Sequence, residues 1–332
     1  MRFGFSHRPI QPLRRSIELY QYAEELGFDY AWVPDQQFYQ DPFACLAAAA
    51  LSTRRITLGL AVTNPFTRHP ALIARGIGVV DELAEGRMIL ALGAANRKQV
   101  LEPLGLDTSR TAERLRETVS IVRRLLAGER VQHESRNFTL RGIQLSYRPR
   151  ADIPIWIGSR SPLVLELAGE VADGVLMEVL HTPTALDYAL GRVAAGAAKA
   201  GRGLDALETT CWQPGQVLDD ASQFTAEHRA FVAHMIGGTP DAVLGHVGVR
   251  PEVVAAVKAD YAVGGPEGAA HHITPTEIDQ LTMIGTVEQI RAKLRQVQAR
   301  GVNGVSWVLL MPYDEIRETL RRLAEDVLPE FR

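Results

Sequence analysis

The sequence is poor in the features that mark secreted or membrane-anchored proteins. Only two of its 332 residues are cysteines, Cys45 and Cys211, and two thiols far apart in a chain of this length provide no disulfide framework. The alanine run at 47–50 is too short and too closely flanked by charge to span a bilayer. Residues 1–6 favour a strand and lack the pattern of a signal peptide. We therefore expect a cytoplasmic protein with no membrane partner.

A large excess of charge of either sign is also absent. Lysine and arginine number 36 against 39 aspartate and glutamate residues, which gives a formal net charge of −3, so we expect no general attraction to nucleic acid. No GxGxxG motif follows the first predicted strand, which disfavours an open dinucleotide-binding sheet. The GxSxG motif of a nucleophilic serine is missing too.

What the sequence does contain is a regular alternation of short apolar strands with amphipathic helices. In the predicted helix 111–127, for example, Leu115, Val119, Val122 and Leu126 fall on one face. Near-continuous apolar strands are typical of parallel sheets, which are buried on both faces. Eight such repeats favour a single α/β fold of the TIM type, a (β/α)8 barrel. The predicted strands are 2–6, 29–34, 56–62, 87–93, 153–158, 174–179, 208–217 and 304–310.

We expect residues 1–332 to form one domain that carries two insertions. Residues 130–150 break the rhythm of the repeats and predict a small polar hairpin. Residues 219–280 form the second insertion, in which the glycine-rich stretch 264–268 and the pair His271-His272 predict a loop. No linker or shift in composition divides the chain further.

The turn after the fifth predicted strand has the residues of an anion site. In a barrel of this kind the active site lies at the carboxyl ends of the strands. Here a strand ends at Gly158, Ser161 is placed to cap the next helix, and Pro162 suits the first helical position. The free N–H groups of the helix start, with Ser159 and Arg160, would hold a phosphate. An ordinary strand-to-helix turn with a serine cap is the alternative interpretation.

The segment after the third predicted strand is more polar than a short turn requires. It runs from Thr63 through Asn64, Arg68 and His69 to Pro70. These side chains could bind a ligand at the end of the barrel. Alternatively, Asn64 bonds to its own backbone in a turn and His69 packs at the helix start.

Four segments together resemble the luciferase-like oxidoreductases. They are 59–71, 81–96, 154–175 and 284–302. The run 59–71 is most similar to the branch that uses coenzyme F420, which includes methylenetetrahydromethanopterin reductase. The resemblance covers residues 1 to about 180 and about 280 to 328. It implies an F420-dependent oxidoreductase that moves a hydride between reduced deazaflavin and a small organic substrate, and a homodimer formed through the helices after strands one to three.

The resemblance also assigns cofactor contacts. It implies that Asp35 contacts the cofactor ring, and that the Ala61–Val62 bond is a non-proline cis peptide behind the ring. Thr63 and Asn64 would contact the ring edge. The remaining contacts would come from two loops, comprising Ala94, Ala95 and Asn96 in one and Gly158, Ser159, Arg160 and Ser161 in the other.

This chain departs from the family pattern at two positions. Ser6 and Asn96 stand where some F420 reductases have carboxylates, so a proton for the substrate must come from another group, with His7, Asp35 and Tyr39 as candidates. Two other functions stay open. One is an FMN-dependent luciferase-like monooxygenase, with FMN in place of F420, and the other is a non-enzymatic barrel that binds a cofactor.

No metal site is expected from the sequence. His271 and His272 are adjacent, and adjacent side chains rarely share one face. Glu178 and His181 lie three residues apart, but no third ligand is evident.

Overall fold

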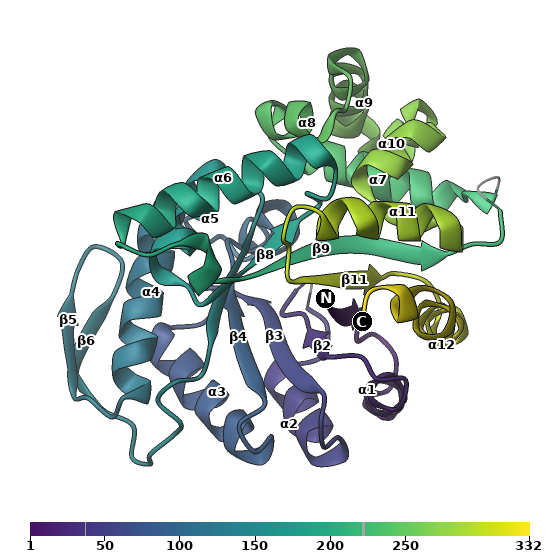
Figure 1. The fold of residues 1–332 in the computed structure, drawn as a ribbon. Coiled ribbons are helices and arrows are strands. Elements are labelled where there is room, and N and C mark those ends of the chain that lie inside the picture. Colours follow the sequence, from purple (N-terminus) through teal and green to yellow (C-terminus); the bar gives the residue numbers. More distant parts are fainter. Residues whose placement is uncertain (37, 221–222) are drawn as a thin grey trace.

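The computed structural model describes residues 1–36, 38–220 and 223–332 and contains a closed parallel barrel (Figure 1). Each barrel strand pairs with the next, and the last strand, β11 (Gly304–Leu309), closes the ring against both β9 (Glu208–Val217) and β1 (Arg2–His7). The (β/α)8 barrel predicted from the sequence is confirmed, and the predicted strand ends differ from the observed ones by at most two residues. The barrel strands are β1 (Arg2–His7), β2 (Tyr30–Val33), β3 (Thr57–Thr63), β4 (Met88–Leu92), β7 (Ile155–Ser159), β8 (Gly174–Glu178), β9 (Glu208–Val217) and β11 (Gly304–Leu309).

Helices surround the barrel as an outer layer. Proline is the first residue of α2, α3, α5 and α6, where its missing N–H group has no intrahelical partner to lose. Among the described residues, no helix combines the length and apolar character needed to cross a membrane. The outer helices are α1 (Leu13–Glu25), α2 (Pro42–Ser52), α3 (Pro70–Leu83), α4 (Thr111–Leu126), α5 (Pro162–Val171), α6 (Pro183–Lys199), α11 (Val287–Gln298) and α12 (Tyr313–Arg322).

Both insertions are ordered elements. The first is an antiparallel hairpin of β5 (Val131–Glu134) and β6 (Thr139–Ile143), as the sequence predicts. The second forms the helices α7 (Ala226–Gly238), α8 (Asp241–Val247), α9 (Pro251–Ala269) and α10 (Pro275–Leu281), which gather beside the barrel in Figure 1. Residues 221 and 222 of this insertion lie outside the described residues. Short elements complete the chain, namely β10 (Met283–Gly285) and helical turns at Arg97–Leu101, Leu204–Ala206, Ala270–His272, Leu323–Val327 and Leu328–Glu330.

The loop predicted at 264–268 is wrong, because only Gly265 leaves the helical conformation there. Helix α9 continues to Ala269 and bends once, at Gly265, whose φ of 65° and ψ of −162° depart from the helix. Glycine adopts this conformation without a steric penalty, and Pro266 then starts the second helical half in the position that proline favours. The glycine and proline therefore produce a kink and no loop.

Aromatic side chains pack in the interior of the barrel. Strand residues alternate between the helical layer and the interior, and the interior cluster includes Tyr30, Trp32 and Trp156. Glycines make room for these rings: a Cβ added to Gly59 would lie 1.9 Å from Trp32 Cε3. The indole Nε1 of Trp32 donates to Ser306 Oγ at 2.9 Å. Because the interior is packed, a ligand site belongs at the carboxyl ends of the strands, which we call the mouth of the barrel.

Candidate functional site

The mouth contains a surface that is poor in side chains and is centred on Val62. The Ala61–Val62 peptide bond is cis, as the resemblance implied, and the pairing of β3 with β4 shifts register between Leu60 and Thr63. The Val62 side chain lies against two glycines on the neighbouring strand ends. A Cβ added to Gly93 would come within 2.6 Å of Val62 Cγ2, and one added to Gly158 within 2.7 Å of Val62 Cγ1.

The predicted phosphate turn follows Gly158 directly. Ser161 occupies the cap position of α5 and Pro162 the first helical position, as expected. The Ser161 side chain makes no capping hydrogen bond. The backbone N–H group of Ser161 donates to Ser159 Oγ at 3.0 Å. Leu163, the next residue, is 70% exposed. Within the turn itself Ser159 is buried, and Gly158, Arg160 and Ser161 are half-buried.

Arg160 in this turn is already engaged. Its Nη1 lies 3.1 Å from Glu178 Oε1 at the end of β8, and its Nη2 donates to the carbonyl of Gly238 at 3.5 Å. The Arg160 carbonyl accepts a 3.4 Å bond from the Tyr188 hydroxyl. These contacts fix the turn between β8 and helix α7 of the second insertion.

Asp35 is the centre of a polar network between β2 and β3. Its Oδ2 accepts from Thr63 Oγ1 at 2.7 Å and from Arg68 Nε at 3.0 Å. Arg68 Nη2 also donates to Asp41 Oδ2 at 2.7 Å, and Asp41 caps α2. Burial opposes ionisation of Asp41, but the hydrogen bond from Arg68 and those from the helix backbone outweigh it and lower the pKa. The network makes Asp35 suited to holding Thr63 and Arg68 in place.

A pocket of about 390 Å³ adjoins this network. Asp35, Tyr39 and Arg68 line it, together with Val100 and Leu104 from the segment after β4. Tyr39 is half-buried, and burial raises the pKa of its phenol while Arg8 opposes the shift. The structure thus brings together two of the three predicted proton donors, Asp35 and Tyr39.

His7, the third predicted proton donor, lies elsewhere. Its ring packs against Phe5 and Tyr20, and its Nε2 is 3.0 Å from Ser16 Oγ on α1. Alternation along β1 turns His7 toward the helical layer. Burial lowers the pKa of His7 to about 4. Its position therefore favours a role in packing over one in proton transfer.

Other predicted contacts have local structural partners. Asn64 Oδ1 accepts from the N–H groups of Phe66 and Thr67, which is the turn-forming alternative. His69 Nδ1 accepts from the Ala71 N–H group at the start of α3. Asn96 Oδ1 likewise accepts from Gln99 N. Ala94 is exposed, and Ala95 has a positive φ of 60°.

Helices α7 and α9 add two groups that the sequence did not reveal. His234 Nδ1 lies 2.8 Å from the Tyr261 hydroxyl, and Lys98 Nζ lies 4.9 Å from the centre of the Tyr261 ring. Burial lowers the pKa of His234, Arg160 and then Arg8 and Lys98 act in the same direction, and Glu178 opposes them. The insertion therefore lies within electrostatic reach of the loops after β1, β4 and β7. Lys98 and Tyr261 are 163 residues apart in the chain, so no local pattern could indicate their contact.

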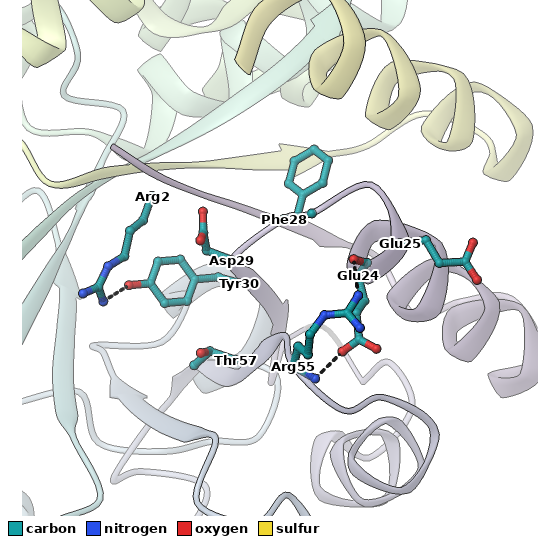
Figure 2. A pocket seen from close by; sticks show the side chains of 9 residues that line it. Arg2, Glu24, Glu25, Phe28, Asp29, Tyr30, Arg55 and Thr57 are labelled. Atoms are coloured by element: carbon teal, nitrogen blue, oxygen red, sulfur yellow. Dashed lines mark hydrogen bonds between the residues drawn. The ribbon is translucent and has the colours of Figure 1, made fainter. Parts of the chain in front are cut away.

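A second hollow lies at the opposite end of the barrel, where the strands begin (Figure 2). Its volume is about 370 Å³. Its polar groups are engaged in structural contacts: Arg2 Nη1 donates to the Tyr30 hydroxyl at 2.9 Å, and Glu24 accepts from the N–H groups of residues 54–56. This end of a barrel generally serves stability.

Known proteins share both the sequence pattern and the fold. A family model described as luciferase-like monooxygenase matches residues 1–304. The 5,10-methylenetetrahydromethanopterin reductase of Archaeoglobus fulgidus is 31% identical over 336 aligned positions, which cover 100% of each chain. An F420-dependent glucose-6-phosphate dehydrogenase of Nakamurella multipartita is 33% identical over 56% of this chain and 59% of its own. Among solved structures, the coenzyme F420-dependent tetrahydromethanopterin reductase of Methanopyrus kandleri superposes with a TM-score of 0.89 at 24% identity, covering 100% of this chain and 99% of that one.

Proposed function

The chain belongs to the luciferase-like monooxygenase family, and from that premise we propose that it is an oxidoreductase that uses coenzyme F420 and acts on a small organic substrate. Relatives named as F420-dependent enzymes support the choice of cofactor. The observation that carries the proposal is the close approach of Val62 to Gly93 and Gly158, directly beside the turn at Ser159 and Ser161 that starts α5. A flat face next to a helix start suits a planar ring that bears an anion.

The residues of the mouth fit such a cofactor. Val62, Gly93 and Gly158 would support the ring, since no side chain larger than valine rises from these three positions. The Ser161 hydroxyl and the positive end of α5 would hold the phosphate. Because Arg160 is paired with Glu178, its role is mainly to fix the turn.

The chemistry of the bound deazaflavin is hydride transfer, which the cofactor supplies. The protein's own contribution is to bind, orient and exclude water. Asp35 would orient Thr63 and Arg68 through the two hydrogen bonds that its Oδ2 accepts. For a proton delivered to the substrate, one proposed source is Tyr39, which lines the pocket beside Asp35. The other is the pair His234–Tyr261, because the charges of the loops after β1, β4 and β7 act on His234.

The proposed assembly is a homodimer formed through α2 and α3. Leu72, Val79 and Leu83 are exposed on α3 at helical spacing, and Leu51 is 73% exposed on α2. An apolar stripe on the outer face of a helix indicates a partner surface. Cys45 and Cys211 are both buried free thiols, which is consistent with the reducing cytoplasm that we propose as the location.

Cofactor binding tests the proposal. The purified protein is titrated into F420 and, separately, into FMN, and binding is followed by fluorescence quenching. We expect F420 to bind at least tenfold more tightly than FMN. Tight binding of FMN without binding of F420 would instead identify a flavin-dependent monooxygenase, and binding of neither would leave a barrel without a redox cofactor.

A further inference from the structure

We propose that Asp260, His271 and His272 form a binding site for a divalent transition-metal ion of the zinc class. The site lies on the second insertion, and it does not depend on the proposed function. Asp260 comes from the first half of α9, whereas the two histidines follow its second half. The kink at Gly265 brings these two parts of the chain together.

The distances suit one ion. Nε2 of His272 lies 2.8 Å from Asp260 Oδ2, and Nε2 of His271 lies 3.4 Å from the same oxygen. One possible ligand atom from each of the three residues lies within 4.8 Å of the other two. Ligands bound to tetrahedral zinc at about 2.0–2.1 Å are separated by roughly 3.4 Å. The three side chains therefore need only small movements to bind an ion together.

The two histidines share one face despite being adjacent in sequence, so the expectation that they would diverge is wrong. Their ring centres are 3.9 Å apart. Ala270–His272 is a tight helical turn that ends α9, and both rings reach Asp260 from it. A sequence pattern alone does not reveal such a turn.

The hydrogen bonds favour metal binding by His271. Its Nδ1 donates to the Gly268 carbonyl at 2.9 Å, because a carbonyl oxygen can only accept. In the neutral ring the lone pair is then on Nε2, the atom nearest Asp260. A backbone carbonyl that fixes the tautomer in this way is the usual outer contact of a metal-bound histidine. His272 Nε2 donates to Asp260, so binding requires its neutral ring to move that proton to Nδ1.

The ligand set and its exposure define the class of ion. Two imidazoles and one carboxylate suit zinc, cobalt or nickel, whereas magnesium and calcium prefer oxygen ligands. His271 is 64% and Asp260 47% exposed at the side chain, so an ion can reach the site from solvent and keep a water ligand. An ion there would join the two halves of α9 next to Tyr261, whose hydroxyl contacts His234.

Metal binding is measured on the full chain, without a histidine tag and after treatment with a chelator. Calorimetry with Zn²⁺ should give one ion per chain. Co²⁺ should give the visible absorption bands of a tetrahedral site. His271→Ala, His272→Ala and Asp260→Asn should each weaken binding at least tenfold, and circular dichroism checks that these variants fold. His246→Ala, an exposed histidine that stacks on Tyr188, is the matched control and should bind like the wild type.

A second measurement covers variants that fold poorly. Saturating Zn²⁺ should raise the melting temperature of the wild type and of the control by about 2 °C or more, and that of His272→Ala by much less. The proposal is overturned if wild-type Kd is about 1 mM or weaker, or if the three variants bind as tightly as the control. Neither readout involves F420, so this result and the test of the proposed function can fail separately.

Discussion

Arg160 and Glu178 form an ion pair, with Nη1 and Oε1 3.1 Å apart, at the edge of the predicted phosphate turn. The pair places a negative charge close to where a phosphate would bind. Glu178→Gln should remove this repulsion and let Arg160 pair with the phosphate, while the Tyr188 hydroxyl still holds the turn at the Arg160 carbonyl. F420 binding should then tighten two- to fivefold, as expected when one partly exposed charge changes. Fluorescence titration measures the effect. Glu170→Gln, on the same helix that follows the turn, removes the ion pair with Arg116 and should leave the affinity unchanged.

Substitutions of Val62 and Gly158 should have coupled effects on the free energy of unfolding and on cofactor binding. Gly158→Ala puts a Cβ 2.7 Å from Val62 Cγ1, and such overpacking costs roughly 1–3 kcal/mol. Val62→Ala removes that methyl group, so the double variant should regain much of the loss. Urea unfolding and F420 titration of the two single variants and the double variant measure the coupling. Simple addition of the two single effects would contradict the contact.

Gly191→Ala is the matched control for this series. A Cβ added to Gly191 meets no atom within 4 Å, and the residue lies inside α6. Alanine favours a helix over glycine by about 1 kcal/mol. We therefore expect the control to be as stable as the wild type or more stable, with unchanged F420 binding.

The stability of the protein should fall in mild acid because His7 is buried. Its pKa is about 4 in the folded protein and about 6.5 in an unfolded chain. The unfolded state therefore binds more protons between these values, and stability present above about pH 6.5 is lost as the pH falls toward 4, by up to about 3 kcal/mol. Urea unfolding from pH 7 to 4.5 measures this slope. His7→Gln should reduce this slope without abolishing it, because His181 is also buried, with a pKa lowered to about 3, and acts in the same direction. An unchanged slope would show that His7 does not contribute.

The exposed stripe on α3 should hold two copies together. Leu72→Glu and Val79→Glu put charge into the proposed interface, and we expect both variants to elute as monomers in size-exclusion chromatography with light scattering. Ile143→Glu, an exposed apolar residue on β6, should not change the mass. A monomeric wild type would contradict the proposed dimer.

Much of the barrel could be predicted because its information is local. Apolar strands, and glycines such as Gly27 and Gly128 that end helices with a positive φ, indicate each strand–helix repeat from residues that are close in sequence. The turn at Gly158–Pro162 was predictable for the same reason. The resemblance added the Ala61–Val62 cis bond, which no periodicity indicates.

The features that could not be predicted depend on contacts between residues that are distant in sequence. His7 and Ser6 both end the first strand, and only the packing of His7 against Ser16 and Tyr20 distinguishes their directions. The hydrogen-bond partner of His234 is a tyrosine 27 residues away, and burial together with charged residues on loops from the first half of the chain lowers its pKa. A glycine such as Gly265 is typical of a loop, but the residues on either side of it are helical.

The proposed function requires that the turn from Gly158 to Ser161 holds the anion of a deazaflavin at the mouth of the barrel. The most direct measurement compares the affinity for F420 with that for the same deazaflavin without its phosphate-bearing tail, in the wild type and in Ser161→Ala. We predict that the wild type binds F420 at least a hundredfold more tightly than the tail-less ring, and that Ser161→Ala weakens F420 alone. Equal affinities for the two compounds, or an equal effect of the substitution on both, would contradict the account.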